Sequence, residues 1–197
     1  MPVANYQTYC RMLDVAREKR FAYPAINVTS LTTANAVLRG LAESKSDGII
    51  QISTGGGAFA SGSSVKDMAL GAMSIAEHVH RAAERYPVYV ALVTDHCLAG
   101  KLDQFVMPLV EETERRRAAG RPNLFSGHMF DGSDLPLREN LDIAVKLLDR
   151  WVDSPDERPI RRFLVYVTPV WGLHLTGLMF AMLSPQQAAH EAHDRRP

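Results

Sequence analysis

The regular alternation of short apolar segments with amphipathic helices constrains the fold more than any other feature of the chain. Between residues 2 and 150 the pattern predicts strands at 21–28, 48–53, 88–93 and 123–129. It predicts helices around 9–16, 34–41 and 68–79, at 102–117 with a break near Pro108, and at 139–151. Strands that alternate with helices of this length indicate a parallel α/β fold.

Two architectures fit this order of elements. A leading helix followed by four strand–helix units can belong to an open sheet of Rossmann type or to part of a (β/α)8 barrel, and the pattern alone does not separate them. The first strand is followed by Val28, Thr29 and Ser30 and not by a GxGxxG element, which disfavours dinucleotide binding. A complete barrel usually takes about 250 residues. In a chain of 197 residues we expect a partial barrel at most.

The residues after 150 do not continue the alternation. A polar segment at 154–159 is followed by residues 163–190, which contain no Asp, Glu, Lys or Arg. The apolar stretch 163–183 is long enough to cross a membrane, but a proline, a histidine and two glycines interrupt it. We expect two regions, 1–150 as the α/β part and 151–197 as a separate tail, and no membrane association.

Charge and cysteine content narrow the possible partners and compartments. Lys plus Arg and Asp plus Glu number 22 each, so the formal net charge is zero and nothing favours a nucleic-acid partner. The two cysteines, Cys10 and Cys97, do not form a CxxC motif. We therefore expect a reducing, cytoplasmic environment without disulfides. The amphipathic N-terminus lacks the apolar core of a secretory signal.

Polar residues gather where the predicted strands end. Asn27 ends the first strand, Ser53 the second and Asp95-His96 the third, and Asp131 follows the fourth. In parallel α/β proteins the carboxyl ends of the strands form the edge at which ligands bind. We therefore expect a functional site at this edge.

The pair Asp95-His96 allows two interpretations. A neutral imidazole is a good zinc ligand, and a carboxylate beside a metal can exchange protons with a substrate. Alternatively, Asp95 caps the helix that follows and His96 is a half-buried polar residue. From spacing alone both interpretations stay open.

The other strand ends are equally open to two interpretations. Ser53 precedes Thr-Gly-Gly-Gly, which forms either a nest of backbone N–H groups for an anion or a flexible loop. Asp131 is either a metal ligand or the first residue of an Asx turn before Gly132. On the third helix, His78 and His80 are expected to face solvent.

Taken together, the motifs over residues 2–150 resemble those of the class II, zinc-dependent fructose-bisphosphate aldolases. The motifs are FAYPAIN, SDGIIQISTGG, VKDMALGA, YPVYVAL, TDHC, KLD, HMFDGS and ENLDIA. The resemblance implies a (β/α)8 barrel, of which this chain has about the first four strand–helix units. It implies reversible cleavage of fructose 1,6-bisphosphate to dihydroxyacetone phosphate and glyceraldehyde 3-phosphate, with zinc as Lewis acid. A phosphorylated sugar substrate and a homo-oligomer are implied as well.

The resemblance also implies roles for particular residues. By position, His96 matches one of three histidine ligands of the catalytic zinc, and Asp95 matches the aspartate that exchanges a proton with the substrate hydroxyl. Ser53 matches a serine that contacts substrate, and Asn27 lies beside the same pocket. Asp131 matches a ligand of a second cation site.

This chain departs from the family pattern at two positions and in its tail. Val93 stands where the family usually has histidine, and Gly127 stands where serine is common. After Arg150 the other two zinc histidines and the glycine-rich phosphate loops have no counterpart. We expect a truncated or frameshifted aldolase that is inactive and poorly folded in isolation. Alternatives are a tagatose-type ketose-bisphosphate aldolase, a non-catalytic interaction fragment, or a membrane-tethered remnant.

Overall fold

The computed structural model describes residues 2–152 and 164–166, and its strands form two parallel sheets. The first sheet has the order β1 (Ala25–Asn27), β2 (Gly48–Ile52), β3 (Val90–Thr94). The second has the order β4 (Cys97–Leu98), β5 (Met129–Asp131), β6 (Leu164–Tyr166). The parallel α/β prediction is therefore confirmed. Apart from β6, the membrane-length stretch and the rest of the predicted tail after residue 152 lie outside the described residues.

Helices connect these strands. They are α1 (Tyr6–Lys19), α2 (Leu31–Glu43), α3 (Thr54–Ala60), α4 (Met68–Ala83), the 3-10 helix η1 (Ala99–Gln104), α5 (Val106–Ala118) and α6 (Leu137–Val152). Four of the α-helices begin after a residue whose side chain accepts a backbone N–H of the first turn, namely Asn5, Ser30, Ser53 and Asp67. Such caps satisfy N–H groups that have no partner inside the helix. Among the described helices, none has the length and apolar character needed to cross a membrane.

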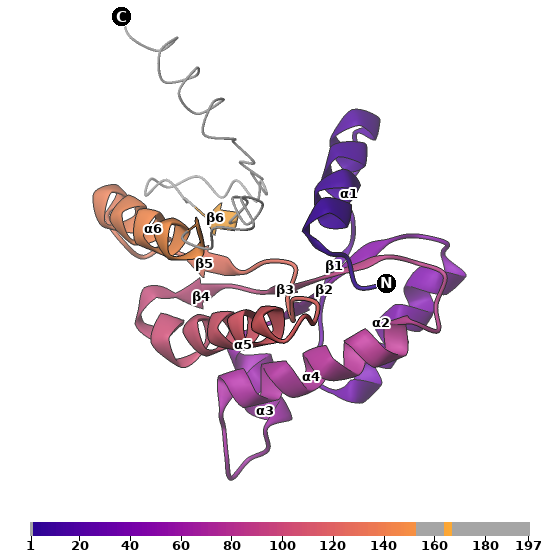
Figure 1. The fold of residues 1–197 in the computed structure, drawn as a ribbon, viewed down its shortest axis with the longest axis horizontal. Helices are drawn as coiled ribbons and strands as arrows, with labels where there is room; N and C mark the ends of the chain where they lie inside the picture. Colours follow the sequence, from indigo (N-terminus) through magenta and orange to yellow (C-terminus); the bar gives the residue numbers. More distant parts are fainter. Residues whose placement is uncertain (1, 153–163, 167–197) are drawn as a thin grey trace, which may run out of the picture.

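The first sheet is covered on both faces. In Figure 1, α2, α4 and α5 lie below the strands and α1 lies above them. Ile50 and Leu92 belong to the larger core, which they share with the buried faces of α2, α4 and α5. Ile49 and Ala91 pack with Met12 of α1 in a second, smaller core. Complete burial of an Ile or Leu side chain contributes about 1.5–3 kcal/mol, so both layers stabilise the sheet.

The N-terminal segment is part of this architecture. Val90 donates its N–H to Pro2 O at 2.9 Å, and Ala4 donates to Val90 O at 2.8 Å. The hydroxyl of Ser126 donates to Ala4 O at 2.8 Å and accepts the N–H of Leu92 at 3.1 Å. The first residues of the chain are thereby attached to β3 and to the segment that leads into β5.

Two strand predictions were wrong in extent. The first strand covers Ala25–Asn27 and not 21–28. The strand predicted at 123–129 begins only at Met129. Leu124 and Phe125, which look like strand residues, are buried in the larger core instead. The apolar residues before β5 therefore belong to the core and not to the start of the ladder.

The break predicted near Pro108 was also wrong in position. Pro108 is the third residue of α5, where its missing N–H would have no acceptor inside the helix in any case. The interruption occurs at Phe105, between η1 and α5, where the backbone adopts φ −127° and ψ −69°. The side chain of Phe105 is fully buried, which holds this corner in place.

The two histidines of α4 do not face solvent as predicted. Both are half-buried. His78 Nε2 lies 2.7 Å from Asn35 Oδ1 of α2, and His80 Nε2 lies 2.9 Å from Leu124 O. Burial lowers the pKa of His80 against the opposing effect of the Leu124 carbonyl. Each imidazole thus connects α4 to a neighbouring element.

Candidate functional site

Asp95 and His96 occupy the gap between two strands. β3 ends at Thr94 and β4 begins at Cys97. The Asp95 N–H still donates to Ile52 O at 2.9 Å, which keeps its backbone beside β2. Asp95 caps no helix: η1 begins after Leu98, without a side-chain cap. The helix-cap interpretation of Asp95 is therefore wrong.

The carboxylate of Asp95 accepts hydrogen bonds from two side-chain amides. Asn27 Nδ2 donates to Oδ2 at 2.6 Å, and Gln51 Nε2 donates to Oδ1 at 3.4 Å. Asn27 and Gln51 are direct partners in the pairing of β1 with β2, so they project from the same level of the sheet. Two amide donors from two strands fix the carboxylate in one orientation.

His96 lies between two carboxylates. Its Nδ1 is 2.8 Å from Asp131 Oδ2, and its Nε2 is 3.9 Å from Asp95 Oδ1. The side chain of His96 is 49% exposed, whereas those of Asp95 and Asp131 are 18% and 12% exposed. The imidazole therefore stands at the surface of a site whose acidic groups lie deeper.

Asp131 forms the Asx turn that one of its two interpretations predicts, and its role as a metal ligand stays a prediction. Its Oδ1 accepts the Ser133 N–H at 2.9 Å, which is an Asx turn, and its Oδ2 contacts His96. Burial raises the pKa of Asp131, but hydrogen bonds from Ser133 and the contact with His96 outweigh burial and hold the pKa below its usual value. Asp131 is therefore an anion that holds both its own turn and His96.

The turn after Asp131 is fixed by a close approach. The Asn140 side chain of α6 donates to Gly132 O at 3.0 Å. A Cβ atom on Gly132 would overlap this side chain, so any larger residue would displace the Asn140 amide from its bond. Helix α6 thus holds the loop that presents Asp131.

Ser53 begins a helix and not the loop predicted from the glycines that follow. Its Oγ accepts the Gly56 N–H at 3.0 Å and caps the seven-residue helix α3. Gly57 contacts the backbone of Met68, and a Cβ on Gly71 would overlap the Gly57 carbonyl. The glycines therefore allow α3 and α4 to cross at backbone distance, and the short helix gives no support for an anion nest.

Sequence reasoning missed three residues around the site. Gln51 is the one amide side chain in the apolar run of β2, at the alternate position that faces Asp95. Thr94 and His128 are buried directly beneath the site, with Thr94 Oγ1 at 3.3 Å from His128 Nδ1. Gln51 could have been found by the period of two in the strand. Nothing in the spacing reveals the Thr94–His128 pair.

The described residues do not make a complete zinc site. A catalytic zinc takes about three protein ligands. Within residues 2–152 and 164–166, no group of three His, Cys, Asp or Glu side chains could hold a metal ion. His96 is the imidazole exposed at this edge, and Asp131 already contacts it.

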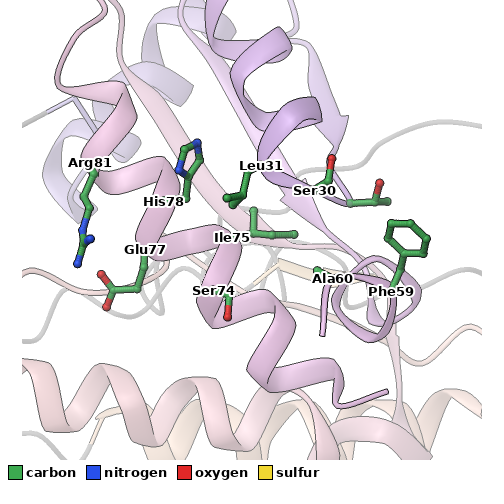
Figure 2. Close-up of a pocket in the computed structure, with 10 residues that line it drawn as sticks. Ser30, Leu31, Phe59, Ala60, Ser74, Ile75, Glu77, His78 and Arg81 are labelled. Carbon is green, nitrogen blue, oxygen red and sulfur yellow. The ribbon is translucent and has the colours of Figure 1, made fainter. Parts of the chain in front are cut away.

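A cavity of about 530 Å³ lies away from this edge. Figure 2 shows it between the start of α2, the end of α3 and α4. Two of its polar side chains already have protein partners: His78 contacts Asn35, and Glu77 pairs with Arg116 of α5. None of Asn27, Asp95 or His96 lines it. The candidate site is therefore the strand-end cluster and not this cavity.

The fold and the strand-end cluster define a parallel α/β protein whose candidate site places a carboxylate held by two amides beside a histidine. A family model described as class-II fructose-bisphosphate aldolase matches residues 7–153, and the chain belongs to this family.

Curated relatives agree. Fructose-bisphosphate aldolase of Streptomyces coelicolor is 55% identical over 150 residues, which are 76% of this chain and 44% of that protein. The class 2 enzyme of Escherichia coli K12 is 42% identical over 146 residues, or 71% and 40% of the two chains. A crystal structure of fructose-bisphosphate aldolase from Campylobacter jejuni matches with a TM-score of 0.70 and 36% identity, over 75% of this chain and 42% of that one. The chain thus spans less than half the length of these relatives.

Proposed function

We propose that residues 1–150 form the N-terminal share of a (β/α)8 barrel and of an aldolase active site, with 151–197 as a separate region. The proposed reaction is reversible cleavage of fructose 1,6-bisphosphate to dihydroxyacetone phosphate and glyceraldehyde 3-phosphate. The observation that supports it most is the carboxylate of Asp95, held by Asn27 at 2.6 Å and by Gln51 at 3.4 Å at the ends of three adjacent strands.

Asp95 is proposed as the group that exchanges a proton with the substrate hydroxyl at the bond to be cleaved. The amide N–H groups that hold it can donate but cannot take up its proton. Asp95 Oδ2 has the shorter bond, to Asn27, so Oδ1 is the oxygen better able to accept a new proton. In the condensation direction the same oxygen returns the proton. A general base of this kind contributes about 10²–10⁴-fold in rate.

Ser53 and Asn27 are proposed as substrate contacts. Ser53 uses an oxygen lone pair to cap α3, and its hydroxyl proton has no acceptor among the described residues. That proton can be donated to a substrate oxygen. Asn27 is half of the pair that orients Asp95, so its removal affects both binding and proton transfer.

His96 is proposed as one ligand of a catalytic zinc whose other two histidine ligands have no counterpart in this chain. When bound, such a zinc acts as a Lewis acid on the substrate ketone. Asp131 is proposed as a cation ligand, although its contact with His96 suits it equally to orienting the imidazole. The proton transfer above depends on Asp95 and its amides alone. A phosphorylated sugar substrate, a homo-oligomer and a cytoplasmic location complete the proposal.

A chimera tests this function directly. Residues 1–150 of this chain are joined to the remainder of the Streptomyces coelicolor relative, and aldol cleavage is measured with zinc. We expect the chimera to cleave fructose 1,6-bisphosphate, and Asp95→Asn to lower kcat by about 10²–10⁴-fold. Asp103→Asn, an exposed carboxylate on η1, is the matched control and should keep full activity.

Two results would overturn the proposal: a folded, zinc-loaded chimera without turnover, or an Asp95→Asn chimera with unchanged turnover. The 197-residue chain alone is expected to show no turnover. Cleavage by that chain that a chelator abolishes would contradict the expectation of an inactive fragment.

A further inference from the structure

We propose that Thr94 and His128 are positioning residues that hold the ends of β3 and β5 at the spacing on which the His96–Asp131 contact depends. The effect on catalysis rests on the function proposed above, whereas the effect on the spacing of β3 and β5 does not depend on that function. Thr94 is fully buried, and His128 is 9% exposed.

The two strands meet here without a continuous ladder. β3 pairs with β2, and β5 pairs with β4 and β6. Between β3 and the segment before β5 there is one isolated bridge, Val93 with Gly127, and the backbone bond from Thr94 N to Gly127 O is long at 3.3 Å. The next bond uses a side chain: the Met129 N–H donates to Thr94 Oγ1 at 3.1 Å. The Thr94 hydroxyl therefore replaces a backbone acceptor at the level where β5 begins.

His128 completes this arrangement. A hydroxyl has one proton and two lone pairs, and its bond to the Met129 N–H uses a lone pair. The Thr94 proton is still available for donation to His128 Nδ1, 3.3 Å away, and we take Thr94 as the donor of this bond. Burial lowers the pKa of His128 to about 4, so the imidazole is neutral near pH 7 and can accept at Nδ1. With Thr94 as the donor, the His128 proton lies on Nε2. The Phe125 ring lies against the imidazole with a centroid separation of 5.3 Å.

The position of the pair explains its effect. Thr94 directly precedes Asp95 and His96, the two residues in the gap between β3 and β4. Beyond the gap, Cys97 pairs with Phe130 and Leu98 with Asp131. Thr94 and His128 hold the near side of the gap, and the β4–β5 pairing holds the far side. The 2.8 Å contact between the His96 imidazole and the Asp131 carboxylate therefore depends on the positions of both sides of the gap.

The experiment compares side-chain nitrogen spectra of the histidines by NMR in the 197-residue chain. Thr94→Val keeps the shape of the side chain and removes the hydroxyl, whereas Thr94→Ser keeps the hydroxyl. We expect wild type and Thr94→Ser to show His128 with an acceptor Nδ1 and a protonated Nε2. We expect Thr94→Val to lose this fixed tautomer and to move the nitrogen shifts of His96. Thr113→Val, which removes a hydroxyl bonded to Leu109 O inside α5, is the control and should change neither histidine.

Kinetics in the chimera provide the second measurement. A misplaced catalytic group lowers turnover more than binding, so we expect Thr94→Val to reduce kcat by about tenfold or more with KM nearly unchanged, and Thr94→Ser to restore it.

If Thr94→Val does not fold, His128→Phe removes the acceptor and keeps a buried aromatic ring, with the same shift expected at His96. Folded variants with wild-type His96 shifts would overturn the proposal, and so would failure of both variants to fold. An inactive chimera in which the His96 shifts still respond to Thr94→Val would overturn only the proposed function.

Discussion

The amide of Asn27 lies 2.6 Å from the carboxylate of Asp95, although 68 residues separate them in the chain. The contact spans the carboxyl ends of β1 and β3, with Gln51 of β2 between them. It needs three strands in register, because a shift of one residue would turn Asn27 or Gln51 to the opposite face of the sheet. The carboxylate of Asp95 is thus positioned by all three strands of the sheet.

Replacing Asn27 by aspartate should change the pH dependence of turnover. In Asn27→Asp a second carboxylate faces Asp95, and two like charges at this distance disfavour ionisation of the pair. We expect the acidic limb of the kcat profile in the chimera to move up by about one pH unit. Asn35→Asp, on α2 beside His78, introduces the same charge away from Asp95 and should leave the profile unchanged. An unaltered profile in Asn27→Asp would show that Asn27 does not face Asp95 during turnover.

The crossing of α3 and α4 predicts that two Gly→Ala substitutions change the free energy of unfolding in opposite directions. In Gly71→Ala the new Cβ overlaps the Gly57 carbonyl and the Ser61 nitrogen, which are backbone atoms that cannot move aside. We expect a loss of about 2–3 kcal/mol in the free energy of unfolding. Gly40→Ala on α2 has no atom within 4 Å of the new Cβ and should gain about 0.5–1 kcal/mol from helix propensity. Urea unfolding of the chimera measures both, and equal effects at the two sites would contradict the crossing.

Burial of His128 predicts a loss of stability in mild acid. Its pKa is about 4 in the folded chain against the ordinary value of 6.5, so the unfolded chain binds a proton between these values and the folded chain does not. The free energy of unfolding therefore rises with pH through this window and is fully restored above about pH 6.5. The difference amounts to about 3 kcal/mol at about 1.4 kcal/mol per pKa unit.

Urea unfolding of the chimera at pH 4.5 and 7.5 measures this linkage. His128→Asn should remove most of the pH dependence. The pKa of His80 is lowered by burial as well, so His80→Asn is the control that identifies the remaining share. If His128→Asn retains the full dependence, the imidazole of His128 is not buried as described.

A buried cation supports the packing of α5 against α4. Arg116 is 3% exposed and forms ion pairs with Glu77 of α4 and with Glu112 one turn earlier in α5. Removing one partner of a buried pair leaves the other charge poorly compensated. We expect Glu77→Leu to cost about 3 kcal/mol, and Arg116→Met in the same chain to return part of that loss. Circular dichroism during urea unfolding checks both, and additive losses in the double variant would contradict the pairing.

The sequence predicted the parallel sheet and the edge at which polar residues gather because both depend on short-range patterns. Asn27, Asp95, His96 and Asp131 come together as expected from their places at strand ends. For Ser53 and the glycines after it the sequence leaves a backbone N–H nest and a flexible loop open, and neither is a helix. Glycine is a poor helix former, but tertiary packing outweighs propensity where α3 crosses α4.

The remaining errors concern contacts between distant segments. Val93 is surrounded by the small apolar core of α1, where Ala4 and Met12 lie, which explains why an apolar side chain fits at this departure from the family pattern. Gly127 leaves room for ordinary contacts with Val93 and Tyr9, so its environment would also accept a serine. No local spacing reveals such neighbours, because they are separated by up to about a hundred residues of chain.

The bond between Ser126 and Ala4 sets an order of events during synthesis on the ribosome. Chains emerge from the N-terminus, and domains generally fold as units as they appear. The Ala4 N–H has no acceptor until Val90 has left the ribosome. The Ala4 carbonyl has no donor from Ser126 until 122 further residues have been added after Ala4. Helix α1 is therefore synthesised before the strands against which it packs in the folded chain. A nascent chain that stops before residue 126 lacks the Ser126 hydroxyl, which bonds the N-terminal segment at Ala4 to the residues that precede β5.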